Sequence, residues 1–416
     1  MAVLVKSPSG DADTNTGVIR STPQPPSPNR QGGVLTACCT MSRLTRLHSV
    51  KPVTIMPVSP EKDIEKALES LELPYLRSDP VSAGVVAGIS VTDDRAQIDL
   101  RFGFPVDSCR GEITDLVQEG LGGVAGDNPD IGVRSKIVAH EVQATLTPIE
   151  GVKNIIAIAS GKGGVGKSTV TVNLALALAA AGAKVGVLDA DIYGPSQARM
   201  LGSDGEQPVS KDGKRFEPLT RHGVFMISAG NLFADEQPAV WRGPMATRAL
   251  TQLALETNWP DLDYLLVDMP PGTGDIQLTL SQKIPVAGAI IVTTPQDIAL
   301  IDARKGYRMF EKVNVPVLGV VENMSTFVCP ACGEVTALFG EGGGAEMAAD
   351  YELPLLGQVP LNADIRAQTD SGSPSVVADP DGPAAREFTN IALNAAALLS
   401  LRKKDYKKAF PKVVVE

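Results

Sequence analysis

The sequence predicts an α/β protein with a doubly wound, mostly parallel sheet, preceded by a small α+β domain and a disordered N-terminal leader. From residue 151 to about 401, short apolar runs alternate with Ala- and Leu-rich helical segments, as in parallel sheets covered on both faces. A different, strand-rich rhythm precedes this region, and the first 57 residues show no regular pattern. We therefore expect four segments: a leader (1–57), a small domain (58–147), a large domain (151–401) and a basic tail (402–416).

Composition restricts the possible functions. The chain has 416 residues, of which 43% are hydrophobic and 21% charged, with a formal net charge of −10. An acidic chain of this kind is a poor partner for nucleic acid, which requires a basic surface. No apolar run is long enough for a transmembrane helix. Five cysteines do not form a disulfide framework and fit a reducing cytosol, so we expect a cytoplasmic protein without a membrane or nucleic-acid partner.

The leader is rich in Ser, Thr, Pro and Gly and cannot bury a core. Residues 1–55 contain no Glu and carry six Lys or Arg residues against two Asp. This bias is compatible with a transit peptide. A plain disordered leader or a later translation start is the preferred interpretation, because Met41 and Met56 could each start the chain and the regular pattern begins just after Met56. We expect residues 1–55 to be dispensable for folding.

The small domain is predicted to be a β-rich meander with two helices. Ser59 would cap a first helix that has Pro60 in its first turn and places Ile64, Leu68 and Leu71 on its apolar face. Three strands are expected at Val85–Val91, Ala96–Phe102 and Lys136–Leu146, and a second helix near Cys109–Leu121.

The large domain is predicted to contain six buried strands, with helices between them such as Thr169–Ala181. The predicted strands are Ile155–Ala159, Val185–Leu188, Phe225–Ser228, Tyr264–Val267, Gly288–Val292 and Val317–Val321.

A phosphate-binding loop follows the first of these strands. The stretch from Gly161 to Ser168 fits G-x-x-x-x-G-K-[ST], and its glycines allow backbone N–H groups to surround phosphate oxygens at a helix N-terminus. Lys167 should reach the β- and γ-phosphates, and the Ser168 hydroxyl should ligate Mg²⁺. The predicted nucleotide-binding residues are Gly161, Lys162, Gly163, Gly164, Val165, Gly166, Lys167, Ser168 and Thr169.

Carboxylates follow two other predicted strands. Asp189 and Asp191 lie two residues apart and would share one face of a strand. Asp268 ends an apolar strand in the Walker B arrangement and should hold Mg²⁺ through water, because Mg²⁺ keeps several waters and takes few protein carboxylates. The glycines after it, in the stretch up to Asp275, suit a loop that moves when the γ-phosphate arrives. Capping of a strand end is the structural alternative for Asp189 and Asp191.

Cys329 and Cys332 form a C-x-x-C pair in the loop after the last predicted strand. Two thiolates at this spacing can grip one metal centre, but a [4Fe–4S] cluster or a structural Zn²⁺ needs four ligands. The chain has no second C-x-x-C, so a site shared by two chains is expected. A zinc site shared in the same way, a redox dithiol and inert cysteines remain alternatives.

Two motifs carry a resemblance to a known family. The pattern K-G-G-x-G-K-[ST], which begins at Lys162, resembles the deviant Walker A P-loop NTPases, a group that includes MinD, ParA, the nitrogenase iron protein and the Mrp proteins. The resemblance implies an ATP-dependent homodimer in which Lys162 reaches the partner's nucleotide. It also implies that Asp191 orients the attacking water, that Asn323 reads adenine from a strand end, and that Asp302 lines the dimer face. Asp189 would support the metal or the loop.

The stretch D-x-P-P-G-x-G-D from Asp268 to Asp275, together with Cys329 and Cys332, is similar to the Mrp/ApbC-type iron–sulfur cluster carriers. This resemblance implies a slow ATPase whose homodimer holds a bridging [4Fe–4S] cluster and transfers it to apo-proteins, with scaffold proteins as further partners. The cofactors implied are ATP, Mg²⁺ and the cluster. A small domain of the kind predicted here is fused ahead of such ATPases, and its Cys109 could be either reactive or a buried structural thiol.

Two other functions remain open. A positioning ATPase like MinD or ParA, with a zinc-pinned dimer, is the main alternative, although the short tail with Pro411 has no clear apolar face for a membrane. A reductase like the nitrogenase iron protein is the second, and the single C-x-x-C loop in place of two separated cysteines speaks against it.

Overall fold

The computed structural model describes residues 58–92, 95–126, 128–211, 213–231 and 243–405. The predictions for residues 1–57, and for the tail beyond residue 405, lie outside the described residues. In the described part of the chain, no helix is long and apolar enough to cross a membrane.

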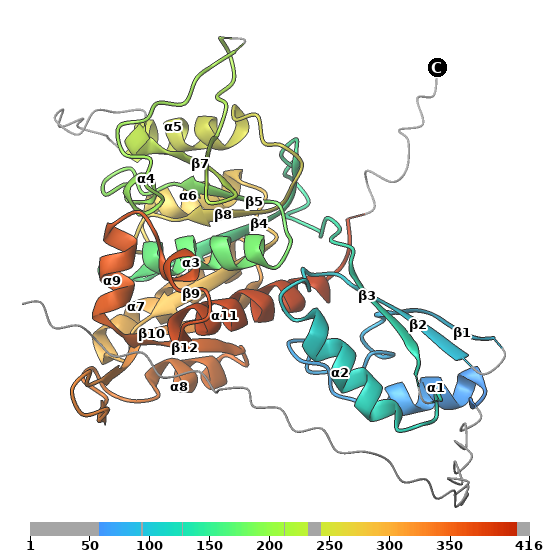
Figure 1. Ribbon diagram of the computed structural model, residues 1–416. Coiled ribbons are helices and arrows are strands. Elements are labelled where there is room, and N and C mark those ends of the chain that lie inside the picture. Colours follow the sequence, from blue (N-terminus) through green and yellow to red (C-terminus); the bar gives the residue numbers. More distant parts are fainter. Residues whose placement is uncertain (1–57, 93–94, 127, 212, 232–242, 406–416) are drawn as a thin grey trace, which may run out of the picture. The chain divides into compact units, whose positions relative to one another are not determined.

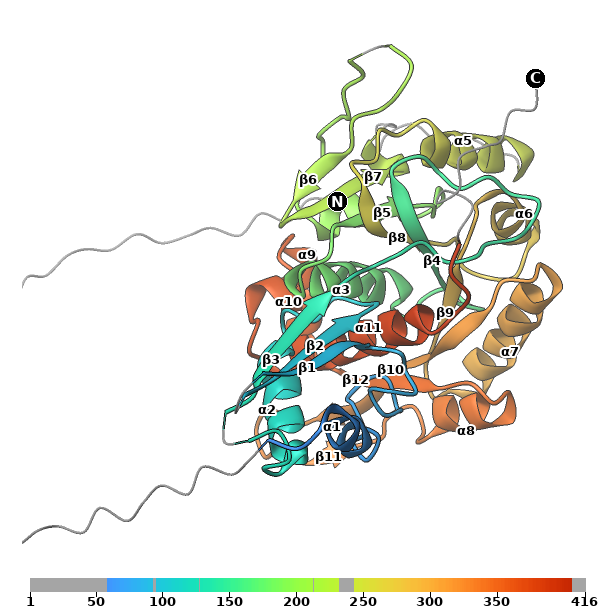
Figure 2. The ribbon, with the colours of Figure 1, turned by 90° about the vertical axis from the view of Figure 1, so that its right-hand side faces the viewer.

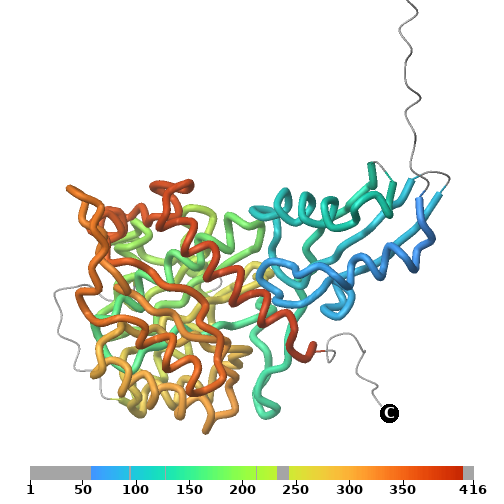
Figure 3. The backbone as a smooth tube through the Cα atoms, turned by 90° about the horizontal axis from the view of Figure 1, so that it is seen from below, coloured from blue at the N-terminus to red at the C-terminus, as the bar shows by residue number. Residues whose placement is uncertain are grey.

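The small domain is an α+β unit, as predicted, in which two helices cover one face of a three-stranded sheet (Figure 3). Its elements are α1 (Glu61–Leu68), β1 (Val86–Thr92), β2 (Arg95–Phe102), α2 (Arg110–Leu121) and β3 (Asp130–Ser135). Alternate residues of β2 are buried, namely Ala96, Ile98, Leu100 and Phe102. This alternation is what one buried sheet face requires.

Two details of the small domain were predicted wrongly. The N-cap of α1 is Pro60, without a side-chain cap, and not Ser59. The third strand is β3 and not Lys136–Leu146, and it runs parallel to β2. Because α2 provides the crossover between β2 and β3, a parallel pairing becomes possible and the meander is excluded. The segment 136–146 instead connects the domain to β4 and has only an isolated bridge at His140.

The large domain has a nine-stranded, mostly parallel sheet with the order β11-β10-β9-β4-β8-β5-β7-β6, and β12 pairs with β10 (Figure 1). The strands are β4 (Val152–Ala159), β5 (Val185–Asp189), β6 (Leu219–Arg221), β7 (Val224–Ser228), β8 (Leu262–Asp268), β9 (Gly288–Thr293), β10 (Val317–Val328), β11 (Val335–Thr336) and β12 (Leu355–Leu361). All six predicted strands are present, so the doubly wound α/β fold is confirmed. Three strands had not been predicted: the antiparallel edge strands β6 and β11, and the parallel strand β12.

Helices cover both faces of this sheet (Figures 1 and 2). They are α3 (Lys167–Ala180), α4 (Gln197–Met200), α5 (Gly243–Leu255), α6 (Asp275–Lys283), α7 (Asp297–Lys312), α8 (Gly343–Asp350), α9 (Ala363–Asp370), α10 (Ser375–Ala378) and α11 (Pro383–Ser400), with a 3₁₀ turn at Ala229–Asn231. On one face, Ile156 and Ile158 of β4 share a core with α3 and α11. On the other, Ile155 and Ala157 share a core with α5, α6 and α7.

Strand β10 is longer than predicted and continues from Val321 to Val328. Pairing on both sides explains the extension: Asn323 lies opposite Val359 of β12, and Val328 lies opposite Val335 of β11. Asn323 is therefore inside a strand and not at its end. Cys329 follows this strand directly, without the intervening loop that the sequence suggested.

Candidate nucleotide and cysteine sites

The P-loop occupies the turn between β4 and α3. Gly166 is the N-cap of α3 with φ = 81°, and Gly164 has φ = 83°. Residues with a Cβ rarely adopt this left-handed conformation, which explains glycine at both positions. The Ser160 hydroxyl donates to the Lys162 carbonyl oxygen at 2.9 Å, and this hydrogen bond stabilises the start of the loop. The result is a helix N-terminus with exposed N–H groups, a natural anion site.

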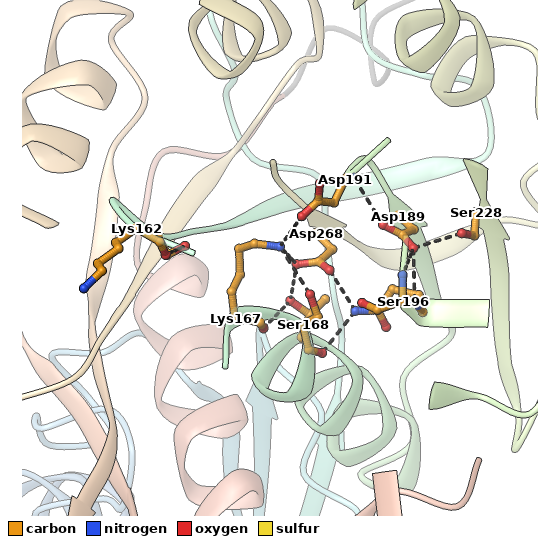
Figure 4. Close-up of polar contacts among 11 residues, drawn as sticks. Lys162, Lys167, Ser168, Asp189, Asp191, Ser196, Ser228 and Asp268 are labelled. Carbon is orange, nitrogen blue, oxygen red and sulfur yellow. Dashed lines mark hydrogen bonds and ion pairs between the residues drawn. The ribbon is translucent and has the colours of Figure 1, made fainter. Parts of the chain in front are cut away.

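Lys167 forms the centre of a buried polar cluster (Figure 4). Its Nζ lies 2.5 Å from Asp268 Oδ1, 3.3 Å from Ser168 Oγ and 4.0 Å from Asp191 Oδ2. Lys167 is 6% exposed and Asp268 is fully buried. The structure thus brings together four of the residues that the sequence singled out, from the P-loop, the end of β8 and the loop after β5.

Two further residues complete the cluster, and the sequence analysis did not identify either. The Thr171 hydroxyl donates to Asp268 Oδ1 at 3.1 Å. Gln197 Nε2 donates to Asp268 Oδ2 at 2.9 Å and to the Ser168 carbonyl oxygen at 3.0 Å. Thr171 lies one helical turn after Lys167 in α3, so helical periodicity could have predicted that the two side chains share one face of the helix. Gln197 is the first residue of the short helix α4, and so short an element shows no periodic pattern from which its position could be predicted.

Asp189 holds the loop after β5 in place. Its carboxylate accepts hydrogen bonds from the N–H groups of Asp191, Ser196 and Gln197 and from the Ser228 hydroxyl, at 2.9–3.1 Å. Burial raises its pKa to about 7, and the neighbouring Asp268 carboxylate acts in the same direction. These contacts correspond to a loop-supporting residue, one of the two roles considered for Asp189.

Asp191 faces the cluster from the same loop and is 9% exposed. Burial raises its pKa, and the nearby Lys167 ammonium opposes this rise. Its carboxylate lies 4.0 Å from the Lys167 ammonium and accepts hydrogen bonds from the backbone of Gly194 and Tyr193, which act to lower its pKa. Asp191 therefore faces Lys167, the lysine that the sequence predicts to bind the phosphates.

The residues fit Mg²⁺ held together with a triphosphate. Such Mg²⁺ keeps several waters and takes one or two protein oxygens, here Ser168 Oγ and Asp268. The buried Gln197 Oε1 and Ser196 Oγ have no hydrogen-bond partner among the described residues. Buried polar atoms are normally paired, so these two are available as acceptors for metal-bound waters.

Lys162 is placed differently from the other P-loop lysine. Its side chain is exposed and points away from Lys167 and the carboxylates (Figure 4). The neighbouring Gly161 lies against α7, where a Cβ would come within 2.1 Å of the Asp302 backbone. The Asp302 side chain forms an exposed pair with Lys305 at 2.9 Å. The structure therefore does not bring Lys162 or the Asp302 carboxylate into the cluster of its own chain.

Asn323 contacts the P-loop backbone. Its Nδ2 donates to the Val165 carbonyl oxygen at 2.9 Å, and a Cβ at Gly166 would lie 2.1 Å from the same nitrogen. This contact had not been anticipated for a residue predicted to read adenine. It shows a further reason for glycine at position 166, namely close approach of a neighbouring side chain.

Cys329 and Cys332 lie in the tight turn between β10 and β11. The Cys329 N–H donates to the Glu334 carbonyl oxygen at 2.9 Å, and the Gly333 N–H donates to the Cys329 carbonyl oxygen at 2.8 Å. Cys329 is half-buried and Cys332 is exposed. The N–H groups of Ala331 and Cys332 lower the pKa of Cys329, which favours the thiolate that binds metals. Within the described ranges, no group of three or more His, Cys, Asp or Glu side chains could hold a metal ion.

Cys109 is a buried thiol at the N-cap of α2. Burial raises its pKa to about 11, and the Glu112 carboxylate acts in the same direction. Its Sγ faces the Val106 carbonyl oxygen at 3.7 Å. Both features favour the structural interpretation of Cys109 over a reactive one.

The fold and the site together define a P-loop NTPase. Residues 151–396 match the family described as ParA, the NUBPL iron-transfer P-loop NTPase, and residues 61–130 match the iron–sulfur cluster assembly protein family. The iron–sulfur cluster carrier protein of Escherichia coli K12 is 48% identical over 333 residues, which cover 80% of this chain and 90% of the relative. The carrier of Pseudomonas fragi is 55% identical over 266 residues, 64% of this chain and 93% of the relative. The chain belongs to the Mrp/ApbC-type iron–sulfur cluster carrier proteins, ParA-like P-loop NTPases with an N-terminal iron–sulfur assembly domain.

The buried pair of Lys167 and Asp268 predicts a specific stability effect. Lys167→Met removes the only ammonium that contacts Asp268 among the described residues and leaves a buried, unpaired carboxylate. We expect the free energy of unfolding, measured by urea denaturation, to fall by about 3–5 kcal/mol. Lys167→Met/Asp268→Asn should recover most of this loss. Lys305→Met, which breaks an exposed pair, should cost less than about 1 kcal/mol. Equal stability of Lys167→Met and Lys305→Met would contradict the expected role of the buried pair.

The environments of the cysteines predict different reactivities. A pKa of about 11 in place of 9.0 leaves Cys109 with about 100-fold less thiolate at pH 8. Iodoacetamide should therefore modify Cys332 at least about 100-fold faster than Cys109 in the folded protein. In concentrated urea the two rates should converge. Mass spectrometry of the two peptides measures both rates, and comparable labelling in the folded protein would exclude a buried, inert Cys109.

Proposed function

We propose that this chain binds an iron–sulfur cluster through Cys329 and Cys332 of two subunits and transfers it to apo-proteins, in a process linked to ATP. The observation that carries the proposal is the accessible two-thiol turn at the end of β10. One chain offers two thiolates there, and a [4Fe–4S] cluster takes four. A two-fold axis through the cysteine turn would supply the other two from a second copy.

Exposure of the turn suits transfer. A cluster that is handed on must be reached by the acceptor's thiolates, which replace those of the donor by ligand exchange. Cys332 is exposed and Cys329 half-buried, so an incoming thiolate meets little obstruction. A permanently held structural metal would instead favour a closed, fully ligated site within one chain. The names of the relatives, iron–sulfur cluster carrier proteins, support the same cargo.

The nucleotide site supports ATP hydrolysis. Lys167 would bind the β- and γ-phosphates, with Ser168 and Asp268 holding Mg²⁺, which supplies charge neutralisation between the phosphates. Asp191 would orient the attacking water, whose oxygen forms the new bond to the γ-phosphorus while the bond to the β,γ-bridging oxygen breaks and ADP leaves. Before this, the Lys167 ammonium must exchange its contact with Asp268 for one with phosphate. That exchange and the need for a second subunit would make the basal rate slow.

Lys162 would complete the site of the other subunit. It is exposed, carries no ion pair with a described residue, and points away from the phosphate-binding cluster of its own chain. Hydrolysis would then depend on dimer formation, because Lys167 is the only cation paired with Asp191 and Asp268 among the described residues.

Anaerobic reconstitution with iron and sulfide tests the cluster proposal. The dimer should bind about four iron and four sulfide ions and absorb in the visible range, and Cys329→Ala/Cys332→Ala should lose both properties. Cys38→Ala/Cys39→Ala is the matched control, since it removes the same number of thiols. If neither protein shows sulfide-dependent absorbance but the wild type retains zinc, a zinc-pinned positioning ATPase of the MinD or ParA kind becomes the better proposal.

Subunit mixing tests Lys162 in trans. Lys162→Ala and Asp191→Asn should each reduce the ATP hydrolysis rate by about 100-fold or more. Mixed dimers would contain one complete site, formed by Asp191 of one subunit and Lys162 of the other. An equimolar mixture should therefore recover up to about a quarter of the wild-type rate, because half of randomly formed dimers are mixed. A mixture as inactive as its components would show that Lys162 acts within its own subunit.

A further inference from the structure

Strand β10 contacts both sites that the proposed function requires. Its middle lies against the P-loop through Asn323, and its C-terminal end leads directly into Cys329. Five residues, 324–328, lie between Asn323 and Cys329, so the two points are at most roughly 20 Å apart along the chain. No other element in the described part of the chain touches the P-loop backbone and also carries the cysteine turn.

The contact between Asn323 and the P-loop is tight. Asn323 is 7% exposed, its Nδ2 donates to the Val165 carbonyl oxygen at 2.9 Å, and the same atom fills the space where a Cβ of residue 166 would be. Val165 and Gly166 belong to the backbone that surrounds the phosphates. A shift of this backbone on phosphate binding must therefore move Asn323 or break its hydrogen bond.

The next residue is the irregular point of β10. Met324 has φ = 56°, a left-handed conformation that is uncommon for a residue with a side chain. The pairing of β10 with β12 shifts register between Asn323 and Phe327. The Met324 side chain also reaches the P-loop, with Cε 3.8 Å from the position of a Cβ at Gly166. Strained residues and bulges of this kind offer an alternative conformation at low cost.

Between Met324 and the cysteine turn, β10 is held by β12 on one side and by β11 on the other. The Ser325 hydroxyl donates to the Val359 carbonyl oxygen of β12 at 3.2 Å. Phe327 and Val328 pair with Thr336 and Val335 of β11. A movement that starts at Met324 therefore has a short path, along a strand held by its neighbours, to the cysteine turn.

We propose that Asn323 and Met324 couple the two sites: binding of a nucleoside triphosphate to the P-loop shifts the end of β10 and changes the accessibility of Cys329 and Cys332. The inference rests on the proposed function, in which nucleotide and cysteine pair serve one activity. It makes Asn323 a positioning residue for the cysteine turn, acting through the P-loop backbone. A residue that only reads adenine would change base preference and leave the thiols unaffected.

The test uses thiol reactivity in the full-length, cluster-free protein. Alkylation rates of the peptide with Cys329 and Cys332 are measured by mass spectrometry, without nucleotide and with saturating Mg²⁺-AMPPNP. In the wild type we expect a change of about five-fold or more. Asn323→Ala should abolish this change while AMPPNP still binds, as titration calorimetry can verify. Ser325→Ala, on the same strand but bonded to β12, is the matched control and should keep the change.

Each outcome decides between the interpretations. A nucleotide effect that is lost in Asn323→Ala but kept in Ser325→Ala supports the coupling. If Asn323→Ala keeps the effect and loses its preference for ATP over GTP, Asn323 reads adenine and the inference is wrong. If the wild type shows no effect while it still assembles a cluster, the inference fails and the cargo proposal survives. If Asn323→Ala does not bind AMPPNP, the same measurement is made on Met324→Gly. This variant relaxes the strained residue and keeps the contact between Asn323 and Val165. An unchanged nucleotide effect on the alkylation rate of Met324→Gly overturns the inference.

Discussion

The buried ion pair between Lys167 and Asp268 is the interaction around which the large domain is organised. An ion pair in the interior is favourable only when further hydrogen bonds compensate the loss of solvation. Thr171 and Gln197 supply these bonds to the two oxygens of Asp268. Three separate segments, the P-loop helix, the loop after β5 and the end of β8, are thereby tied to one carboxylate. The adjacency of β4, β8 and β5 in the sheet makes this possible, since their carboxyl ends meet at one edge.

The charge balance of this cluster explains its chemistry. Three carboxylates, Asp189, Asp191 and Asp268, are buried around a single buried ammonium. Burial raises the pKa of Asp189 to about 7 and that of Asp191 in the same direction, which reflects the cost of burying a carboxylate in its charged form. A divalent cation beside these carboxylates would favour their charged forms. In the proposed function, a magnesium–nucleotide complex would therefore fit this cluster better than the nucleotide alone.

Motifs and apolar runs in the sequence were enough to predict the sheet, the P-loop and the carboxylates, because each depends on local pattern. The errors in the strands occurred where pairing decides the outcome. Lys136–Leu146 alternates like a strand but pairs only at an isolated bridge, while β10 extends to Val328 because β11 and β12 pair with it. Gln197 and the contact of Asn323 with Val165 could not be predicted, since both depend on how segments distant in the sequence pack against the P-loop.

The cysteines show why spacing alone does not define a role. Cys109 lies at a helix start, a position that can lower a thiol pKa, yet burial beside Glu112 has the opposite effect. Cys329 lies in an open turn whose backbone N–H groups favour the thiolate. For the proposed transfer, a cargo must be bound firmly enough to be kept and openly enough to be passed on, and of these two environments the open turn meets both demands. In the proposed coupling, β10, which also contacts the P-loop, would shift the same turn from a distance. Exposure would then permit transfer, and the strand would provide the physical route by which nucleotide times it.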